Sequence, residues 1–332
     1  TGKRDYVDFI KSTVKGNFDG LKIAIDCANG AAYRTTPMMM KKLGVRAITL
    51  NADAQGEFPG HPSEPTEDNL ADLIALTGSV KADVGIAHDG DADRAVFVAR
   101  KGKKGYYMPG DKSLAIVAKT IVRDLGGGQV VTPVSSSSMV EEVVKDAGGS
   151  LIYTAVGSPV VARRMMKEGA VFGGEENGGL IFADHQYCRD GAMSIAKILE
   201  GIAKYGSLYN QVEELPVYHV DKRKIECPNN RKESLIEYMK EWAMRTDPKA
   251  SKKDGGFSLQ GYGIIKSEFI RLSAELRKKF NVIYLFHDSM TKVDENVFYE
   301  LVVEGSARTL VYQPADLAAH LFIQNAKRYL GF

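Results

Sequence analysis

The chain has 332 residues, of which 44% are hydrophobic, so it is long enough for two or three domains and too apolar for a disordered protein. Its 44 basic and 42 acidic residues leave a net charge of +2 without a long basic block, which argues against a nucleic-acid partner. Three widely spaced cysteines and no long apolar segment argue against a disulfide framework, a secretory signal and a membrane span, and predict a cytoplasmic protein.

Helical and strand patterns alternate over the first hundred residues. Amphipathic or capped helical patterns occur at residues 5–14, 36–43 and 69–78. Short apolar runs typical of buried strands occur at 21–27, 45–50, 83–87 and 95–99. A polar loop at 51–67, rich in glycine and proline, is long enough to have a function. The alternation predicts an α/β layered domain at residues 1–104.

The same alternation continues and predicts a second mixed-sheet α/β domain at residues 105–215. Its helices are expected at 113–123, 139–147, 160–168 and 192–203. Its strands are expected at 129–134, 151–154, 170–173 and 180–182. We expect a C-terminal α+β domain at residues 216–332, with a helix at 266–280 and strands near 281–286 and 298–303.

Three carboxylates lie in the turn between the last two strands of the first domain. Asp89, Asp91 and Asp93 alternate along the chain, so a curved segment can direct all three toward one point, where their repulsion favours a bound cation. An EF-hand is excluded because Arg94 and Arg100 stand where its glycine and glutamate belong. The hard oxygen ligands predict Mg²⁺, and Arg94 beside them predicts an anionic substrate. A solvated acidic turn is the alternative.

Two turns in the second domain offer groups for catalysis or binding. The serines at 135–138 invite a nucleophile interpretation, but serine is a favoured helix N-cap and the run precedes the helix at 139–147, so we prefer capping. Gly157 and Ser158 open the next helix, whose N-terminus can bind phosphate. An ordinary turn explains these two residues equally well.

A glycine-flanked acidic loop at 174–179 is the second candidate site. Glu175, Glu176 and Asn177 offer acceptors and an amide for sugar hydroxyls, and in an extended loop Glu175 and Asn177 point the same way. The motif alone is weak, because Gly-Glu-Glu also forms solvated turns. His185 follows the loop, and an isolated histidine is usually structural.

The loop at 89–94, the loop at 174–179 and the run Arg189-Asp190-Gly191, in that order, resemble the α-D-phosphohexomutases, the phosphomannomutase and phosphoglucomutase family. The resemblance implies a Mg²⁺ site at the three aspartates and a role in phosphoryl transfer for Arg94. It also implies sugar contacts from Glu175 and Asn177. We add Gly157, Ser158 and Arg189 to the expected substrate-binding residues.

For function, the resemblance implies intramolecular phosphoryl transfer between the 1- and 6-positions of mannose or glucose phosphates, with hexose phosphate and hexose bisphosphate as ligands. Family members carry a phosphoserine followed by histidine in an earlier domain, and this sequence contains no Ser-His dipeptide. We therefore expect the phosphoserine domain to be missing from this chain, and a separate N-terminal domain or a homo-oligomer as its partner. The chain alone is expected to show no mutase turnover.

Two other functions stay open at this point. A Mg²⁺-dependent sugar-phosphate phosphohydrolase would use the same carboxylates and would release inorganic phosphate. A non-catalytic hexose-phosphate-binding protein would bind ligand without exchange. The family's Arg-Pro-Ser-Gly-Thr-Glu-Pro loop, which contacts the substrate phosphate, has no counterpart in the sequence.

Overall fold

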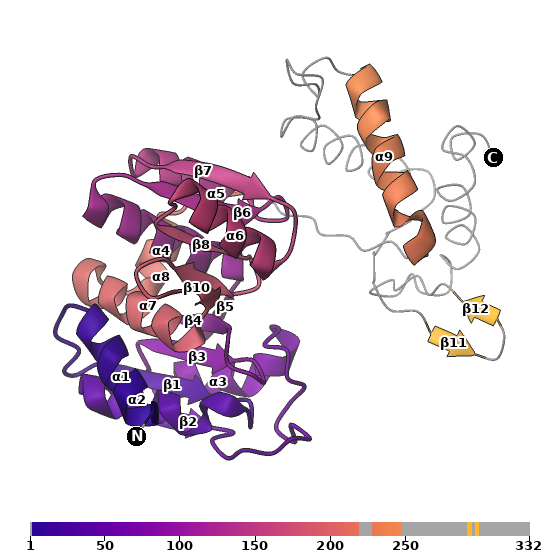
Figure 1. The fold of residues 1–332 in the computed structure, drawn as a ribbon. Coiled ribbons are helices and arrows are strands. Elements are labelled where there is room, and N and C mark those ends of the chain that lie inside the picture. Colours follow the sequence, from indigo (N-terminus) through magenta and orange to yellow (C-terminus); the bar gives the residue numbers. More distant parts are fainter. Residues whose placement is uncertain (1, 219–227, 247–290, 294–295, 299–332) are drawn as a thin grey trace. The chain divides into compact units, whose positions relative to one another are not determined.

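The computed structural model describes residues 2–218, 228–246, 291–293 and 296–298, and the chain divides into two units, Thr1–Tyr218 and His219–Phe332. The first unit contains two five-stranded sheets with helices packed against them (Figure 1). These two sheets confirm the predicted consecutive α/β layers. Among the residues described, no helix is both long and apolar enough to cross a membrane.

The first sheet has the strand order β2-β1-β3-β4-β5. Its strands are β1 (Lys22–Asp26), β2 (Arg46–Leu50), β3 (Val84–His88), β4 (Ala95–Lys101) and β5 (Lys104–Met108). Strand β1 pairs in parallel with β2 and β3, whereas β3, β4 and β5 form an antiparallel meander. The helical segments of this layer are α1 (Gly2–Thr13), η1 (Ala31–Tyr33), α2 (Thr35–Leu43), η2 (Asp68–Leu70) and α3 (Ala71–Ser79).

The second sheet has the order β10-β9-β8-β6-β7. Its strands are β6 (Gln129–Pro133), β7 (Ser150–Thr154), β8 (Phe172–Gly174), β9 (Leu180–Phe182) and β10 (Gln186–Arg189). Its helices are α4 (Gly110–Leu125), α5 (Ser138–Asp146), α6 (Ser158–Glu168), α7 (Gly191–Tyr205) and α8 (Leu208–Glu213). Strand β6 pairs in parallel with β7 and β8, and β8, β9 and β10 run antiparallel.

The two sheets therefore repeat one topology. In each, the first strand lies between the second and the third, and the third, fourth and fifth strands form a meander. The β3–β4 connection contains the three aspartates, and the equivalent β8–β9 connection contains Glu175 and Asn177. Both candidate loops thus lie at the carboxyl end of a central parallel strand, which is where open α/β sheets bind ligands.

A single hydrophobic core connects the two sheets. It contains Ile23 and Ile25 of β1, Phe97 of β4, Val130 of β6 and Phe182 of β9, together with buried residues of α1, α2, α4, α5 and α7. The opposite face of each sheet has a smaller core of its own, one with α3 and one with α6. Because side chains alternate along a strand, one face of each sheet is free to join the shared core. This shared core fixes the distance between the two candidate loops.

Two strands and one α-helix of the first unit were not predicted. Strand β5 extends the first sheet to Met108, beyond the predicted boundary at 104, and β10 and α8 were also missed. Both strands lie at sheet edges and only Met108 of their residues is buried, so neither has the apolar run that marks a buried strand. We keep the three-domain division as a proposal.

The second unit contains a helix that was also not predicted, α9 (Asn229–Thr246), and an antiparallel hairpin of β11 (Thr291–Val293) and β12 (Asn296–Phe298). The expected helix at 266–280 and the expected strand near 281–286 lie outside the described residues. Of the strand expected at 298–303, only Phe298 is described, and it ends β12.

Gly191, the first residue of α7, provides a test of how tightly the two α/β layers join. A Cβ atom there would lie 2.6 Å from the Arg94 carbonyl oxygen and 2.8 Å from His88 Nδ1, both at the aspartate loop. We expect Gly191→Ala to lower the free energy of unfolding by ~1–3 kcal/mol, the usual cost of overpacking. In the matched variant Gly56→Ala, where nothing lies within 4 Å, stability should stay within ~1 kcal/mol of wild type. Equal urea midpoints for the two variants would contradict the close packing.

Candidate functional site

The loop between β3 and β4 brings its three aspartates together. Asp89, Asp91 and Asp93 each offer one carboxylate oxygen, and these three atoms lie within 4.8 Å of one another. Asp89 is buried, Asp93 is half-buried and Asp91 is exposed, so the cluster opens to solvent on one side. The geometry agrees with the convergence expected from their alternation in the sequence.

A buried histidine holds this loop in shape. His88 Nδ1 lies 3.0 Å from the Arg94 carbonyl oxygen, and His88 Nε2 lies 2.8 Å from the Thr36 hydroxyl. Since a carbonyl only accepts, Nδ1 carries the proton, and burial lowers the pKa of His88, which favours the neutral ring. Thr36 therefore donates to Nε2. The result is a neutral, fully paired support beneath the acidic loop, which sequence inspection did not identify.

The aspartates suit a hard divalent cation. Oδ1 of Asp93 is buried and receives no hydrogen bond from the residues described, and Arg94 Nε is 3.8 Å away. Burial raises the pKa of Asp89, although Arg94 opposes that shift by donating to its carboxylate. An oxygen-only donor set with an unsatisfied carboxylate oxygen matches what Mg²⁺ requires.

Arg94 is held between two carboxylates. Its Nε donates to Asp89, and its Nη1 and Nη2 donate to Glu64 at 2.8 Å each. Its backbone N–H also donates to Asp89 at 3.1 Å. The hydrogen bonds that Arg94 donates to Glu64 raise the pKa of the guanidinium further. Glu64 comes from the 51–67 loop, which the sequence marked as potentially functional without singling out this residue.

The 174–179 loop is a tight turn and not an extended segment. Glu175 N–H donates to Gly179 O at 2.9 Å, and Gly178 N–H donates to Glu175 O at 3.3 Å. Glu175 is only 4% exposed, whereas Asn177 is exposed and its Oδ1 accepts from Gly179 N–H at 3.0 Å. The expected extended backbone is therefore wrong, whereas the shared direction of Glu175 and Asn177 stays a prediction.

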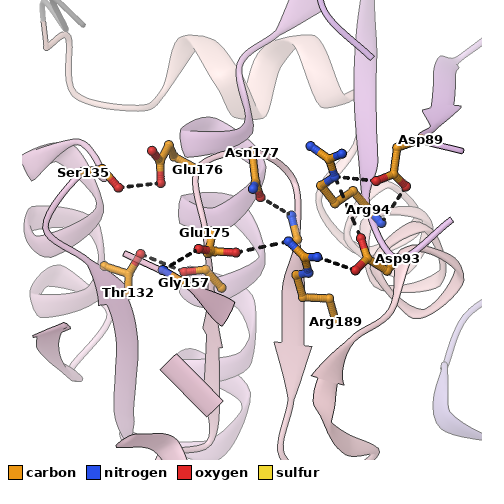
Figure 2. A network of polar contacts seen from close by, with 12 residues as sticks. Asp89, Asp93, Arg94, Thr132, Ser135, Gly157, Glu175, Glu176, Asn177 and Arg189 are labelled. Atoms are coloured by element: carbon orange, nitrogen blue, oxygen red, sulfur yellow. Dashed lines mark hydrogen bonds and ion pairs between the residues drawn. The ribbon is translucent and has the colours of Figure 1, made fainter. Parts of the chain in front are cut away.

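Arg189, at the end of β10, joins the two loops (Figure 2). Its Nη2 donates to Asp93 Oδ2 at 2.5 Å and its Nη1 to Glu175 Oε2 at 3.2 Å. Ala95 N–H also donates to Gly178 O at 3.2 Å, which links the backbone of β4 to the 174–179 loop. The two candidate sites of the sequence are thus one continuous polar surface.

The turn before α6 contributes to the same surface. Gly157 has a φ of 126° and its N–H donates to Glu175 Oε1 at 3.1 Å, so this amide holds the glutamate in place. Ser158 begins α6 and is half-buried. The structure thus places Gly157 beside Glu175, as Figure 2 shows, and Ser158 follows it in the chain.

The remaining candidates have structural partners. Ser137 caps α5 by accepting from Met139 N–H, which confirms the capping interpretation, and Ser135 donates to Glu176 at 3.0 Å. His185 Nε2 lies 2.7 Å from Asp190, which also caps α7, and its ring stacks on Phe9. These contacts agree with a structural role for the histidine.

Comparisons with known proteins agree with this geometry. The family models for the phosphoglucomutase/phosphomannomutase alpha/beta/alpha domains II and III match residues 4–102 and 109–218. A phosphoglucomutase/phosphomannomutase of Thermococcus kodakarensis is 36% identical over 258 residues, covering 76% of this chain and 55% of that protein. A probable phosphoglucosamine mutase of Methanopyrus kandleri is 39% identical over 232 residues, covering 70% and 51% respectively.

A solved structure shows the same fold. The crystal structure of a phosphoglucomutase/phosphomannomutase family protein from Burkholderia thailandensis has a TM-score of 0.64 and 28% sequence identity, covering 74% of this chain and 51% of that one. The chain spans about half the length of the curated relatives it matches. With both domain models matched in order over its two sheets, the chain belongs to the phosphoglucomutase/phosphomannomutase family.

Proposed function

We propose that this chain takes part in phosphoryl transfer on hexose phosphates, with Mg²⁺ at Asp89, Asp91 and Asp93 and the sugar bound at the 174–179 loop. Relatives named phosphoglucomutase, phosphomannomutase and phosphoglucosamine mutase support a hexose phosphate as the substrate class. The proposal extends to a hexose bisphosphate, the intermediate that a transfer between the two ends of one sugar requires.

One observation carries the proposal, namely the bridge from Asp93 through Arg189 to Glu175. A site that transfers phosphate on a sugar has to hold the phosphoryl group and the ring at a fixed separation. Arg189 contacts a carboxylate of each loop, so the position of one loop depends on the other. A phosphohydrolase would need only the aspartates, and the bridge to a second loop therefore favours a sugar-phosphate mutase.

In this proposal, Arg94 binds the phosphoryl group that is being transferred. Its planar guanidinium suits the two oxygens of a phosphate, and it lies within the loop of the three aspartates. Mg²⁺ bound by the aspartates would neutralise charge that develops on the same group. Ser158 begins α6, and we expect it to donate to the more distant phosphate of the substrate.

The 174–179 loop would recognise the sugar through two different groups. Asn177 is exposed and can bind ring hydroxyls directly. Glu175 is buried and accepts from Arg189 and Gly157, so it orders the loop, and we expect its carboxylate to accept from a sugar hydroxyl as well.

Ligand titration tests the proposed function. We expect glucose 1,6-bisphosphate to bind this chain and to bind more tightly with Mg²⁺, as measured by calorimetry. We expect no conversion of glucose 1-phosphate by these 332 residues alone, since no serine in them precedes a histidine. Release of inorganic phosphate would contradict the proposal in favour of a phosphohydrolase. Conversion above a buffer control would place the phosphoryl carrier within the chain, with Ser135 the first residue to test.

The metal site is tested by Asp91→Ala. We expect Mg²⁺ binding to disappear in calorimetry, because one of three ligands is lost. Asp91 is exposed, so its repulsion with its neighbours is screened, and stability without metal should stay within ~0.5 kcal/mol of wild type. The matched variant Asp68→Ala removes an exposed carboxylate from η2 and should retain the metal. Unchanged Mg²⁺ affinity in Asp91→Ala would remove the aspartates from the metal site.

The proposed role of the 174–179 loop in sugar binding is tested by Glu175→Gln. Removing its charge weakens the contact with Arg189, and we expect bisphosphate binding to weaken by roughly 1–3 kcal/mol, the scale for hydrogen bonds to a charged group. Mg²⁺ affinity should stay at the wild-type value. The control Glu142→Gln, an exposed acid on α5, should leave both affinities unchanged. Loss of Mg²⁺ binding with bisphosphate binding intact would overturn the assignment.

A further inference from the structure

The guanidinium of Arg94 has both of its hydrogen-bonding edges occupied by carboxylates. Asp89, on the same loop, accepts from Nε, and Glu64, on the 51–67 loop, accepts from both terminal nitrogens at 2.8 Å. The second contact is a bidentate pair, the geometry with which arginine also binds phosphate. Hydrogen bonding to Arg94 lowers the pKa of Glu64, which keeps this carboxylate charged at neutral pH.

The two carboxylates differ in how firmly they are held. Asp89 is buried, with a side chain only 2% exposed, so its contact with Arg94 is part of the protein interior. The side chain of Glu64 is 60% exposed, while that of Arg94 is 17% exposed. An exposed partner in an ion pair regains its hydration when it leaves, so breaking this pair costs little. Glu64 is therefore the exchangeable ligand of Arg94.

Hydrogen bonds fix the backbone around Glu64, whereas its side chain is largely exposed. The Glu64 carbonyl accepts from Asn69 Nδ2 at 2.8 Å and from Thr66 N–H at 2.9 Å. The 51–67 loop also packs tightly on the aspartate loop, since a Cβ atom at Gly90 would lie 2.9 Å from Phe58 Cζ and 3.2 Å from Ser63 Cβ. The carboxylate can consequently move into solvent without any displacement of the loop.

We propose that Glu64 occupies the position of a substrate phosphoryl group on Arg94 and is displaced when that group binds. The inference rests on the proposed function, because it takes Arg94 to be a phosphate ligand. Glu64 holds the guanidinium toward the aspartates in the absence of substrate and competes with phosphate for the same two nitrogens. It is a positioning residue that sets the affinity of this site for phosphate.

The test compares phosphate affinities of matched variants. Glu64→Gln removes the competing charge, and in calorimetry with saturating Mg²⁺ we expect inorganic phosphate to bind roughly fivefold more tightly than to wild type, the scale of one exposed ion pair. Glu67→Gln removes the same charge from an exposed position on the same loop and controls for the general electrostatic effect. Mg²⁺ affinity and the thermal midpoint should be equal in all three proteins.

The Arg94→Gln background identifies the partner of Glu64. There, adding Glu64→Gln should change phosphate affinity no more than adding Glu67→Gln does. Weaker phosphate binding in Glu64→Gln than in wild type would overturn the proposal, because Glu64 would then assist Arg94. Equal effects of Glu64→Gln and Glu67→Gln would overturn it as well. Absence of phosphate binding in wild type and every variant would contradict the proposed function together with this inference. A phosphate affinity that is the same in wild type and in Glu64→Gln would contradict this inference alone.

Discussion

The site depends on one guanidinium shared by two carboxylates from different sheets. Arg189 contacts Asp93 and Glu175, and a backbone hydrogen bond from Ala95 to Gly178 runs beside it. These contacts are possible because a continuous hydrophobic core holds the two sheets at a fixed separation. The two guanidinium groups of Arg94 and Arg189 pair with the carboxylates of Asp89, Asp93, Glu64 and Glu175, and Asp91 adds a fifth carboxylate to the aspartate cluster. The surplus of negative charge is what a divalent cation would balance.

The repeated topology explains why two loops so far apart in sequence serve one site. Each sheet places its third strand next to its first, and the turn that follows that third strand carries the functional residues. The two turns have diverged in chemistry. One collects carboxylates and an arginine, to which we assign a metal and a phosphoryl group, and the other combines a buried glutamate with an exposed amide, to which we assign a sugar. In the proposed function, two copies of one architecture thus supply the two halves of a hexose-phosphate site.

Much of the fold and of the candidate site could be predicted from the sequence. Buried strands and amphipathic helices carry their own apolar pattern, and alternating aspartates suggest one cation. The edge strands β5 and β10 could not, since only Met108 of their residues is buried. His88 and Glu64 were missed for a different reason. Their roles come from contacts with Thr36 and Arg94, 52 and 30 residues away, which no local pattern encodes. The turn at 174–179 was misjudged because its shape comes from hydrogen bonds between its own backbone groups.

A crystal structure of this chain with Mn²⁺ and glucose 1,6-bisphosphate would test most directly whether the two loops form one site. The account predicts an anomalous peak for Mn²⁺ in contact with Asp89, Asp91 and Asp93, one phosphoryl group beside that ion, and the hexose ring against Asn177 and Glu175. A metal bound away from the aspartates, or a sugar bound away from the 174–179 loop, would contradict it.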